Sequence, residues 1–300
     1  MLDLWVIITI LAAFSQNLRS AFQKKLQNDL SDIGATNVRF LFGLPFAIIY
    51  FLFLHNSYEV TLTSIPNKFI LFTILGGVSQ IIATFLLLKI FNYKNFAVGT
   101  TYSKTEPIQA LFFSILILGE TISYMGMIGI IIGIFGVIFI SYKSDKLSYD
   151  NKPDSKNSIY LGLLSGALFG IAAVMFRGAS LSLNLDNLLY SSGLTLLVAL
   201  FIQTTLLGIY LIITDKNQIL LSFDNLKDCT IVGFFGALAS MCWFYAMSIQ
   251  NVAYVRALGQ IELVFTILMT LIYFKEKISF REIIGICFIL IGITVIILNS

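Results

Sequence analysis

Apolar runs long enough to cross a lipid bilayer fill most of this chain. A helix spans the hydrocarbon core with about 20 mostly apolar residues. Ten stretches qualify: 4–25, 33–54, 69–91, 97–118, 122–142, 158–182, 187–213, 229–249, 252–274 and 279–298. Only 12% of residues are charged, whereas a soluble domain carries about a quarter. The runs are too long for strands and lack period-two alternation. The sequence therefore predicts an all-α integral membrane protein with ten transmembrane helices.

An internal repeat organises these spans. The polar, proline-containing segment 143–157 separates them into two sets of five. Shifted by 156 positions, the stretch that starts at Asn95 aligns without a gap with the stretch that starts at Asn251. Residues that are uncommon in membrane runs coincide: Asn95 with Asn251, Glu106 with Glu262, Glu120 with Glu276, Gly129 with Gly285 and Gly136 with Gly292. We predict two five-helix repeats, 1–142 and 158–300, joined by the linker 143–157.

An odd number of spans in each repeat predicts inverted topology, because equivalent positions then face opposite sides of the membrane. Inverted repeats are common in transporters, which alternate between two access states. Glu106 and Glu262 each fall about ten residues into their spans, near mid-bilayer at a rise of about 1.5 Å per residue. The two acids are therefore predicted to mark a central site.

These features resemble the drug/metabolite transporter superfamily, and its EamA branch most closely. The resemblance rests on the two five-helix halves, on the turns LGETIS (118–123) and FKEKIS (274–279), and on the Gly-rich last helix of each half. It covers essentially the whole chain. It implies a ten-helix fold, a cavity lined mainly by helices 1, 3, 4, 6, 8 and 9, and secondary transport of one of many solute classes. The small multidrug pumps of this superfamily use a Glu in their first helix, where this chain has Ser15, Gln16 and Asn17.

Seven charged residues fall inside the predicted spans and at least four residues from either end: Arg19, Arg39, Lys104, Glu106, Arg177, Arg256 and Glu262. Each costs a few kcal/mol unless it faces a cavity, a partner or the interface. Glu106 and Glu262 are either structural ion pairs or groups that contact substrate or carry protons, and we predict the second role. Lys104 lies about 200° from Glu106 around a regular helix, so we expect Glu106 to face the cavity and Lys104 to point elsewhere.

The remaining bases have simpler expected roles. Arg256 either reaches the membrane surface or offers a planar guanidinium to a carboxylate or phosphate. Arg19 and Arg177 lie near helix ends and are expected to anchor at the interface. Arg39 is expected to form a structural pair. Pro107 removes a backbone donor and is expected to kink the fourth span beside Glu106.

The predicted substrate-binding set combines the polar and aromatic side chains of these spans: Gln16, Gln80, Tyr102, Glu106, Gln109, Trp243, Tyr245, Arg256, Gln260 and Glu262. Tyr102, Glu106 and Gln109 share one helical face. Trp243 and Tyr245 serve either as a cavity wall or as core packing. Glu106 and Glu262 are also the candidate proton-coupling residues. Five bases against two acids within the spans favour an anionic or zwitterionic solute, such as an amino acid.

Other chemistries lack the necessary residues. Cys229, Cys242 and Cys287 have no metal-ligand or CxxC spacing, and His55 is the only histidine, so we expect no metal, no cofactor and no enzyme activity. The net charge of +3 gives no basis for nucleic-acid binding, and no GxxxxGK[ST] motif is present. The open alternatives are an exporter of cationic drugs or polyamines, a membrane-embedded enzyme acting on lipid-linked substrates, and a structural protein. One chain holds both halves, so a functional monomer is expected.

The lysines and arginines in the connections and at the adjoining ends of the spans predict the orientation. Thirteen fall in odd-numbered connections, and only Lys68 falls in an even-numbered one. Because basic loops stay cytoplasmic, we expect a multi-pass protein of the cell inner (plasma) membrane with both termini outside. The N-terminal segment is expected to be a retained first span, since it lacks a basic leader and a cleavage site.

Overall fold

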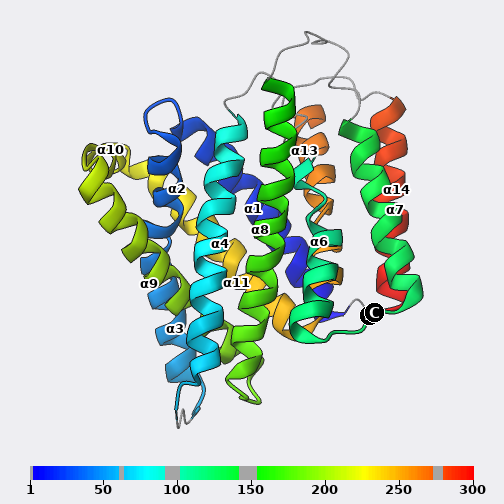
Figure 1. Ribbon diagram of the computed structural model, residues 1–300, viewed down its shortest axis with the longest axis horizontal. Helices are drawn as coiled ribbons and strands as arrows, with labels where there is room; N and C mark the ends of the chain where they lie inside the picture. The colour runs from blue at the N-terminus through cyan, green and yellow to red at the C-terminus, as the bar shows by residue number, and fades with distance from the viewer. Residues whose placement is uncertain (1–2, 61–63, 92–101, 142–153, 273–279) are drawn as a thin grey trace.

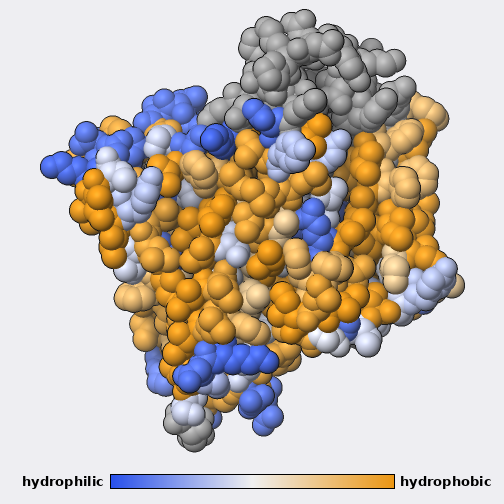
Figure 2. Space-filling view, viewed as in Figure 1, coloured by the Kyte–Doolittle hydropathy of each residue, from blue (hydrophilic) through white to orange (hydrophobic). Residues whose placement is uncertain are grey.

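A computed structural model of the chain describes residues 3–60, 64–91, 102–141, 154–272 and 280–300. These residues form a bundle of helices that run roughly side by side (Figure 1), and no strand occurs among them. Six helices are long and apolar enough to cross a membrane: 4–26, 32–57, 67–90, 159–182, 188–214 and 226–249. A broad hydrophobic band surrounds the visible face of the bundle, with hydrophilic groups gathered toward its two ends (Figure 2). The predicted all-helical membrane class is confirmed.

The described residues of the first half form α1 (Leu4–Leu26), α2 (Asp32–Leu41), α3 (Leu44–Ser57), α4 (Asn67–Phe91), α6 (Glu106–Phe113), the π-helix η1 (Ser114–Leu118) and α7 (Tyr124–Ser141). The Ser31 hydroxyl caps α2 by accepting a hydrogen bond from the Gly34 amide. Residues 42–43 form a turn, and Pro45 stands in the first turn of α3. The predicted span 33–54 therefore corresponds to the candidate span 32–57, which a turn divides into α2 and α3.

The second half contributes α8 (Asp154–Ser182), α9 (Leu188–Thr214), α10 (Asn217–Asp224), α11 (Leu226–Ile249), α12 (Val252–Leu258), α13 (Ile261–Ile272) and α14 (Phe280–Leu298). The short helix α10 occupies a connection for which the sequence predicted no helix. Two of its apolar residues, Leu220 and Phe223, are exposed. The positions of apolar residues in the sequence therefore do not predict a buried helix here.

Two repeat-matched helices are interrupted next to the acids. A turn at Lys104–Thr105 precedes α6, which starts at Glu106 with Pro107 in its first turn. A turn at Gly259–Gln260 separates α12 from α13, whose second residue is Glu262. Both carboxylates therefore stand in the first turn of a helix, where the helix dipole favours negative charge. The interruption at Pro107 agrees with the predicted kink, but no proline marks the one before α13.

The most extensive helix contacts join one half of the chain to the other, as α1 with α11, α4 with α8, and α7 with α14. Trp243 of α11 meets Gln16 of α1, and farther along Lys25 of α1 meets Asp228 of α11. The two partners in this pair therefore run in opposite directions.

Glycines allow the close contact between α7 and α14. A Cβ added to Gly129 would lie 2.9 Å from the Gly292 carbonyl oxygen, and one added to Gly136 would lie 2.6 Å from that of Gly285. The contacts therefore move from position 292 to 285 of α14 as they move from 129 to 136 of α7, so the two helices are antiparallel. Close contact at these glycines is what the sequence predicted, because glycine lets helix backbones approach in a membrane.

The bundle has two distinct ends. At one end, called the lysine end, α1 finishes with Lys24 and Lys25 in its last turn. At the other, called the terminal end, α1 begins and α14 finishes, close to the mark for the C-terminus (Figure 1). The cavity described next has a different relation to each end.

Candidate functional site

A cavity of about 300 Å³ lies among the helices in the middle of the bundle. Its lining comes from both halves of the chain: Gln16, Asn17, Arg19, Ser20, Ala21, Lys24, Leu87, Ser103, Lys104, Glu106, Phe169, Arg256, Glu262, Leu263 and Thr266. Lys24 belongs to the last turn of α1, so the cavity extends from the middle of the bundle toward the lysine end. Its volume is at the lower limit for small-molecule sites.

Glu262 carries the first of two ion pairs in this cavity. Lys104 Nζ lies 3.0 Å from Glu262 Oε2, and Gln16 Nε2 donates to the same oxygen at 2.9 Å. Asn17 Nδ2 donates to the Glu262 carbonyl oxygen at 3.2 Å and to Thr266 Oγ1 at 2.6 Å. The second-half acid is therefore held by side chains of the first half.

Glu106 forms the second pair, with Arg256. The two side chains are only 10% and 11% exposed, against 14% for Glu262 and 22% for Lys104. The Arg256 guanidinium also lies over the Trp243 ring, 4.4 Å from its centroid, a cation–π geometry. Each repeat-matched acid thus pairs with a base from the opposite half.

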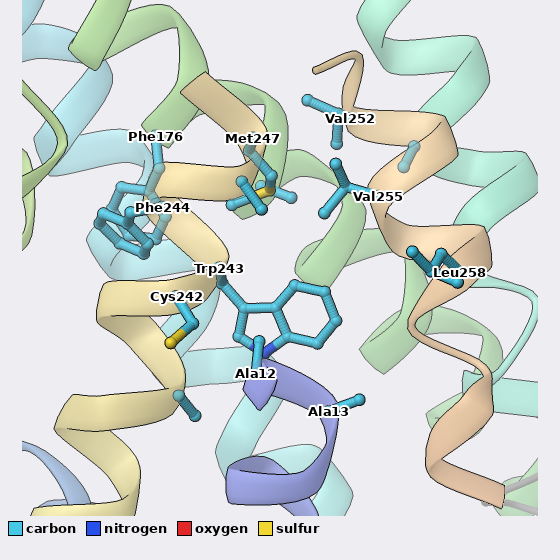
Figure 3. Packing of buried hydrophobic residues seen from close by; sticks show 14 of the residues in the cluster. Ala12, Ala13, Phe176, Cys242, Trp243, Phe244, Met247, Val252, Val255 and Leu258 are labelled. Atoms are coloured by element: carbon cyan, nitrogen blue, oxygen red, sulfur yellow. The ribbon is translucent and has the colours of Figure 1, made fainter. Parts of the chain in front are cut away.

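Trp243 links the cavity to the hydrophobic core. Its indole Nε1 donates to Gln16 Oε1 at 3.0 Å, and its ring lies between α11, the Ala12–Ala13 segment of α1, and α12 (Figure 3). Gly259 permits this packing, because an added Cβ there would lie 2.5 Å from Trp243 Cη2. Trp243 is 5% exposed and belongs to the main core cluster. It therefore combines the two roles that the sequence left open.

A smaller cavity of about 20 Å³ adjoins this region and includes Gln16, Arg39, Gln80, Trp243 and Arg256 in its wall. Arg39 Nη1 donates to Thr84 Oγ1 at 2.9 Å, and its guanidinium lies 5.2 Å from the Phe40 ring centroid. The hydrogen-bond partner of Arg39 is thus a hydroxyl group on α4.

Toward the terminal end the cavity is closed by apolar packing. Phe176 and Phe244 lie with ring centroids 4.4 Å apart, next to Met247 (Figure 3). All three side chains are almost completely buried.

A polar cluster, here called the terminal clamp, lies beyond this packing. Arg177 forms an ion pair with Glu120 and donates to the carbonyl oxygens of Met247 and Gln250. Tyr254 Oη lies 3.0 Å from Ser123 Oγ and accepts from the Ser123 amide at 3.1 Å. Gly119, with a φ of 67°, turns the chain out of η1 immediately before Glu120, a backbone conformation suited to glycine.

Arg177 therefore binds protein groups at the terminal end. The sequence suggested instead that it anchors at the membrane surface. Glu276, the repeat counterpart of Glu120, lies outside the described residues.

The ten predicted substrate-binding residues separate into two groups. Gln16, Glu106, Arg256 and Glu262 line the larger cavity, and Gln80 and Trp243 line the smaller one. The other four line neither: Tyr102, Gln109, Tyr245 and Gln260.

Hydrogen bonds to other protein groups explain why two of these four side chains, Gln109 and Gln260, do not line a cavity. Gln109 Nε2 donates to Thr105 Oγ1 at 3.1 Å and to the Leu163 carbonyl at 3.5 Å, which directs it to α8. Gln260 Nε2 donates to the Arg256 carbonyl oxygen at 3.4 Å. The face shared by Tyr102, Glu106 and Gln109 does not form, because the turn at Lys104–Thr105 interrupts the helix.

The same turn brings together Lys104 and Glu106, which both line the cavity. Only Glu106 was expected there, because the two residues point apart on an unbroken helix. Arg19, Asn17 and Thr266 were not predicted to belong to the site. The signal available for Arg19 was the polar stripe that it forms on α1 with Gln16, Ser20 and Gln23, but its position near a helix end suggested surface anchoring.

Metal binding has no counterpart in the described part of the chain, where no three His, Cys, Asp or Glu side chains come together as ligands. The polar groups of the cavity are amides, hydroxyls and ion pairs. Such groups bind and orient a polar solute through hydrogen bonds and charge.

An all-helical membrane bundle with a charged cavity between its two halves defines the class of protein. The model of the EamA-like transporter family matches the chain twice, over residues 3–142 and 156–298. The chain belongs to this family, which confirms the resemblance to the EamA branch of the drug/metabolite transporters. Members of the family are membrane transporters.

The fold is shared with a solved structure described only as a crystal structure of a protein. The TM-score is 0.72 and the match covers 98% of this chain and 96% of that one, at 12% sequence identity. At this identity the likeness shows the fold alone. No curated protein matches the chain.

Proposed function

We propose that this protein is a secondary transporter that moves a small polar organic metabolite across the cell inner membrane by alternating access. The proposed cargo is an amino acid or another zwitterionic or anionic solute. The observation that carries the proposal is the central cavity, which is lined by ion pairs between the two halves. It extends toward the lysine end, and buried side chains close it toward the terminal end.

Ten spans in two inverted repeats form the architectural part of the proposal. The six long helices, the three shorter apolar helices 106–118, 124–140 and 283–298, and the interrupted pair α12–α13 supply ten crossings. The antiparallel contact of α7 with α14 joins the last helix of each half. The contact of α1 with α11 likewise corresponds to that of α8 with α4 when the halves are exchanged. Inverted repeats have this relation.

Alternating access requires that closure pass from one end of the bundle to the other. The terminal clamp and the Phe176–Phe244 packing close the terminal end here. We propose that transport releases the clamp while the lysine end closes. Because basic connections stay cytoplasmic, the lysine end is proposed to face the cytoplasm, with both chain termini outside. A reporter fused after Ser300 tests this orientation, and activity confined to the cytoplasm would reverse it.

Proton coupling through Glu106 and Glu262 is the mechanistic part of the proposal. Each acid is paired with a base, so it can accept a proton only when its ion pair separates. Opening and closing of the cavity provides such a step, since the pairs join helices of opposite halves. The coupling would tie proton movement to the conformational change.

Flux measurements in proteoliposomes test the function. The wild-type protein is screened with amino acids, other carboxylates and polyamines, with and without a pH gradient, alongside Glu106→Gln and Glu262→Gln. We expect uptake of an anionic or zwitterionic solute that both substitutions reduce. Flux that neither substitution changes would remove the two acids from the mechanism, and flux of polyamines alone would favour cation export.

A further inference from the structure

Arg19 differs from Lys104 and Arg256 of the central cavity because no carboxylate pairs with it among the described residues. Its side chain is 3% exposed and lines the cavity. Nη2 donates to Ser20 Oγ at 3.1 Å, while Nε and Nη1 are buried without a hydrogen-bond partner in the described part of the chain. A buried guanidinium without an ion-pair partner is costly, because its hydration is lost and a single hydrogen bond to the Ser20 hydroxyl replaces only part of it.

The acids of the cavity are already engaged by other bases. Glu106 pairs with Arg256, and Glu262 Oε2 receives both Lys104 and Gln16. Among the described residues, the lining contains these two acids and no other carboxylate. The described lining therefore holds two more bases than acids. They are Lys24, which lies in the last turn of α1 toward the lysine end, and Arg19, which lies deeper along the same helix.

The stem of Arg19 lies against α11 at Gly236. A Cβ added to Gly236 of α11 would lie 3.4 Å from Arg19 Cδ and 3.4 Å from Arg39 Cγ. The absence of a side chain at Gly236 thus gives both arginines room against α11. A guanidinium positioned before a ligand arrives loses less conformational entropy on binding.

Arg177 shows what such a residue looks like when its partners are present. The segment Leu18-Arg19-Ser20-Ala21 of α1 resembles Phe176-Arg177-Gly178-Ala179 of α8, the first helix of the second half. Arg177 contacts one carboxylate and two carbonyl oxygens. At the corresponding position Arg19 faces a cavity instead.

We infer that Arg19 binds the anionic group, a carboxylate or a phosphate, of the transported solute. This inference rests on the proposed transport function and identifies the side chain that sets its charge selectivity. The planar guanidinium presents several N–H donors in a geometry that matches either group. Asn17, Glu262 and Thr266 line the same cavity, so they lie within reach of the polar groups of the rest of the solute.

Binding measurements on the intact protein in lipid nanodiscs test the inference. Thermal stabilisation is titrated with the standard amino acids, lactate, succinate and glycerol 3-phosphate, each beside its uncharged amide or alcohol counterpart. We expect the wild type to bind a charged probe about 10- to 100-fold more tightly than the neutral one, the range of a hydrogen bond to a charged group. The carboxylate and phosphate arms distinguish the two anions.

The Arg19→Gln variant should lose this preference and bind both members of a pair equally. Arg19→Lys keeps the charge without the planar donor geometry and should retain part of the preference, which also covers the case in which the Gln variant does not fold. Lys25→Gln is the matched control, since it removes a base of the same helix outside the cavity. A charge preference that survives Arg19→Gln, or the absence of any anionic ligand for the wild type, would overturn the inference.

Failure of this inference can be told apart from failure of the transport proposal. Arg19-dependent binding without flux in proteoliposomes would contradict transport and leave the anion site in place. Flux whose charge preference is unchanged in Arg19→Gln would contradict the anion site and leave transport in place.

Discussion

Glu106 and Glu262 are counterparts in the two halves, and each stands in the first turn of an interrupted helix. Their surroundings differ. The Glu106–Arg256 pair is the more deeply buried and is covered by Trp243, whereas Lys104 and Glu262 are more exposed to the cavity. The two acids, which align with each other in the sequence, thus stand in different surroundings. We interpret the buried Glu106–Arg256 pair as the stronger link between the halves in this state, and the Lys104–Glu262 pair as the one that solute or protons reach first.

The largest expected effect comes from breaking the buried pair. Glu106→Ala leaves Arg256 without its carboxylate and should lower stability by about 3–5 kcal/mol, the usual cost of an uncompensated buried charge. Thermal unfolding in detergent measures it, and the double variant with Arg256→Gln should recover part of the loss. Equal losses for Glu106→Ala and Glu262→Ala would remove the distinction between the two acids.

The second prediction concerns the terminal clamp, whose acid Glu120 belongs to the first half and whose base Arg177 belongs to the second. Glu120→Gln weakens a charge-assisted contact, worth about 1.5–3 kcal/mol, and should raise the population open at the terminal end about tenfold or more. Labelling of a cysteine placed at Met247 reports this opening. Unchanged labelling would show that the clamp does not hold that end closed.

The glycines between α7 and α14 offer a third test, because here the halves should behave alike. Gly136→Ala and Gly292→Ala each place a methyl group about 2.6 Å from a backbone oxygen of the facing helix. Both should destabilise by about 1–3 kcal/mol through overpacking. Gly208→Ala is the control, since no described atom lies within 4 Å of its added Cβ. Markedly unequal losses at the two contacts would argue against the repeat symmetry of this helix pair.

The smallest stability effect is expected at the accessible pair. Glu262→Gln keeps the hydrogen-bonding size of the side chain next to a partly exposed Lys104, so stability should fall by about 1 kcal/mol or less. Solute flux should nevertheless fall about tenfold or more, because the cavity loses one of its two acids. Flux at the wild-type level with unchanged stability would show that Glu262 is dispensable, and Lys25→Gln serves as the surface control.

Much of the architecture could be predicted because the membrane restricts the solutions. Backbone groups in lipid must be satisfied within the chain, so long apolar runs become helices and their number follows from length. The constant offset of the repeat aligns the two acids with each other and the glycines of α7 with those of α14. The site was harder to predict. Gln16, Glu106, Arg256 and Glu262 line the larger cavity, and their role in substrate binding stays a prediction. Tyr102 and Gln109 were assigned from an ideal helix that the turn at Lys104–Thr105 interrupts.

The sequence by itself determined the membrane class, the family and the alignment of the two acids with each other, because these depend on local hydrophobicity and on a constant spacing along the chain. Only the tertiary structure decided which base meets which acid, since those partners lie on helices far apart in the sequence. Arg19 shows the reason most clearly. Its residue type and position suggest a surface anchor, and only the packing of α1 against α11 places its guanidinium in the cavity, where no described carboxylate pairs with it.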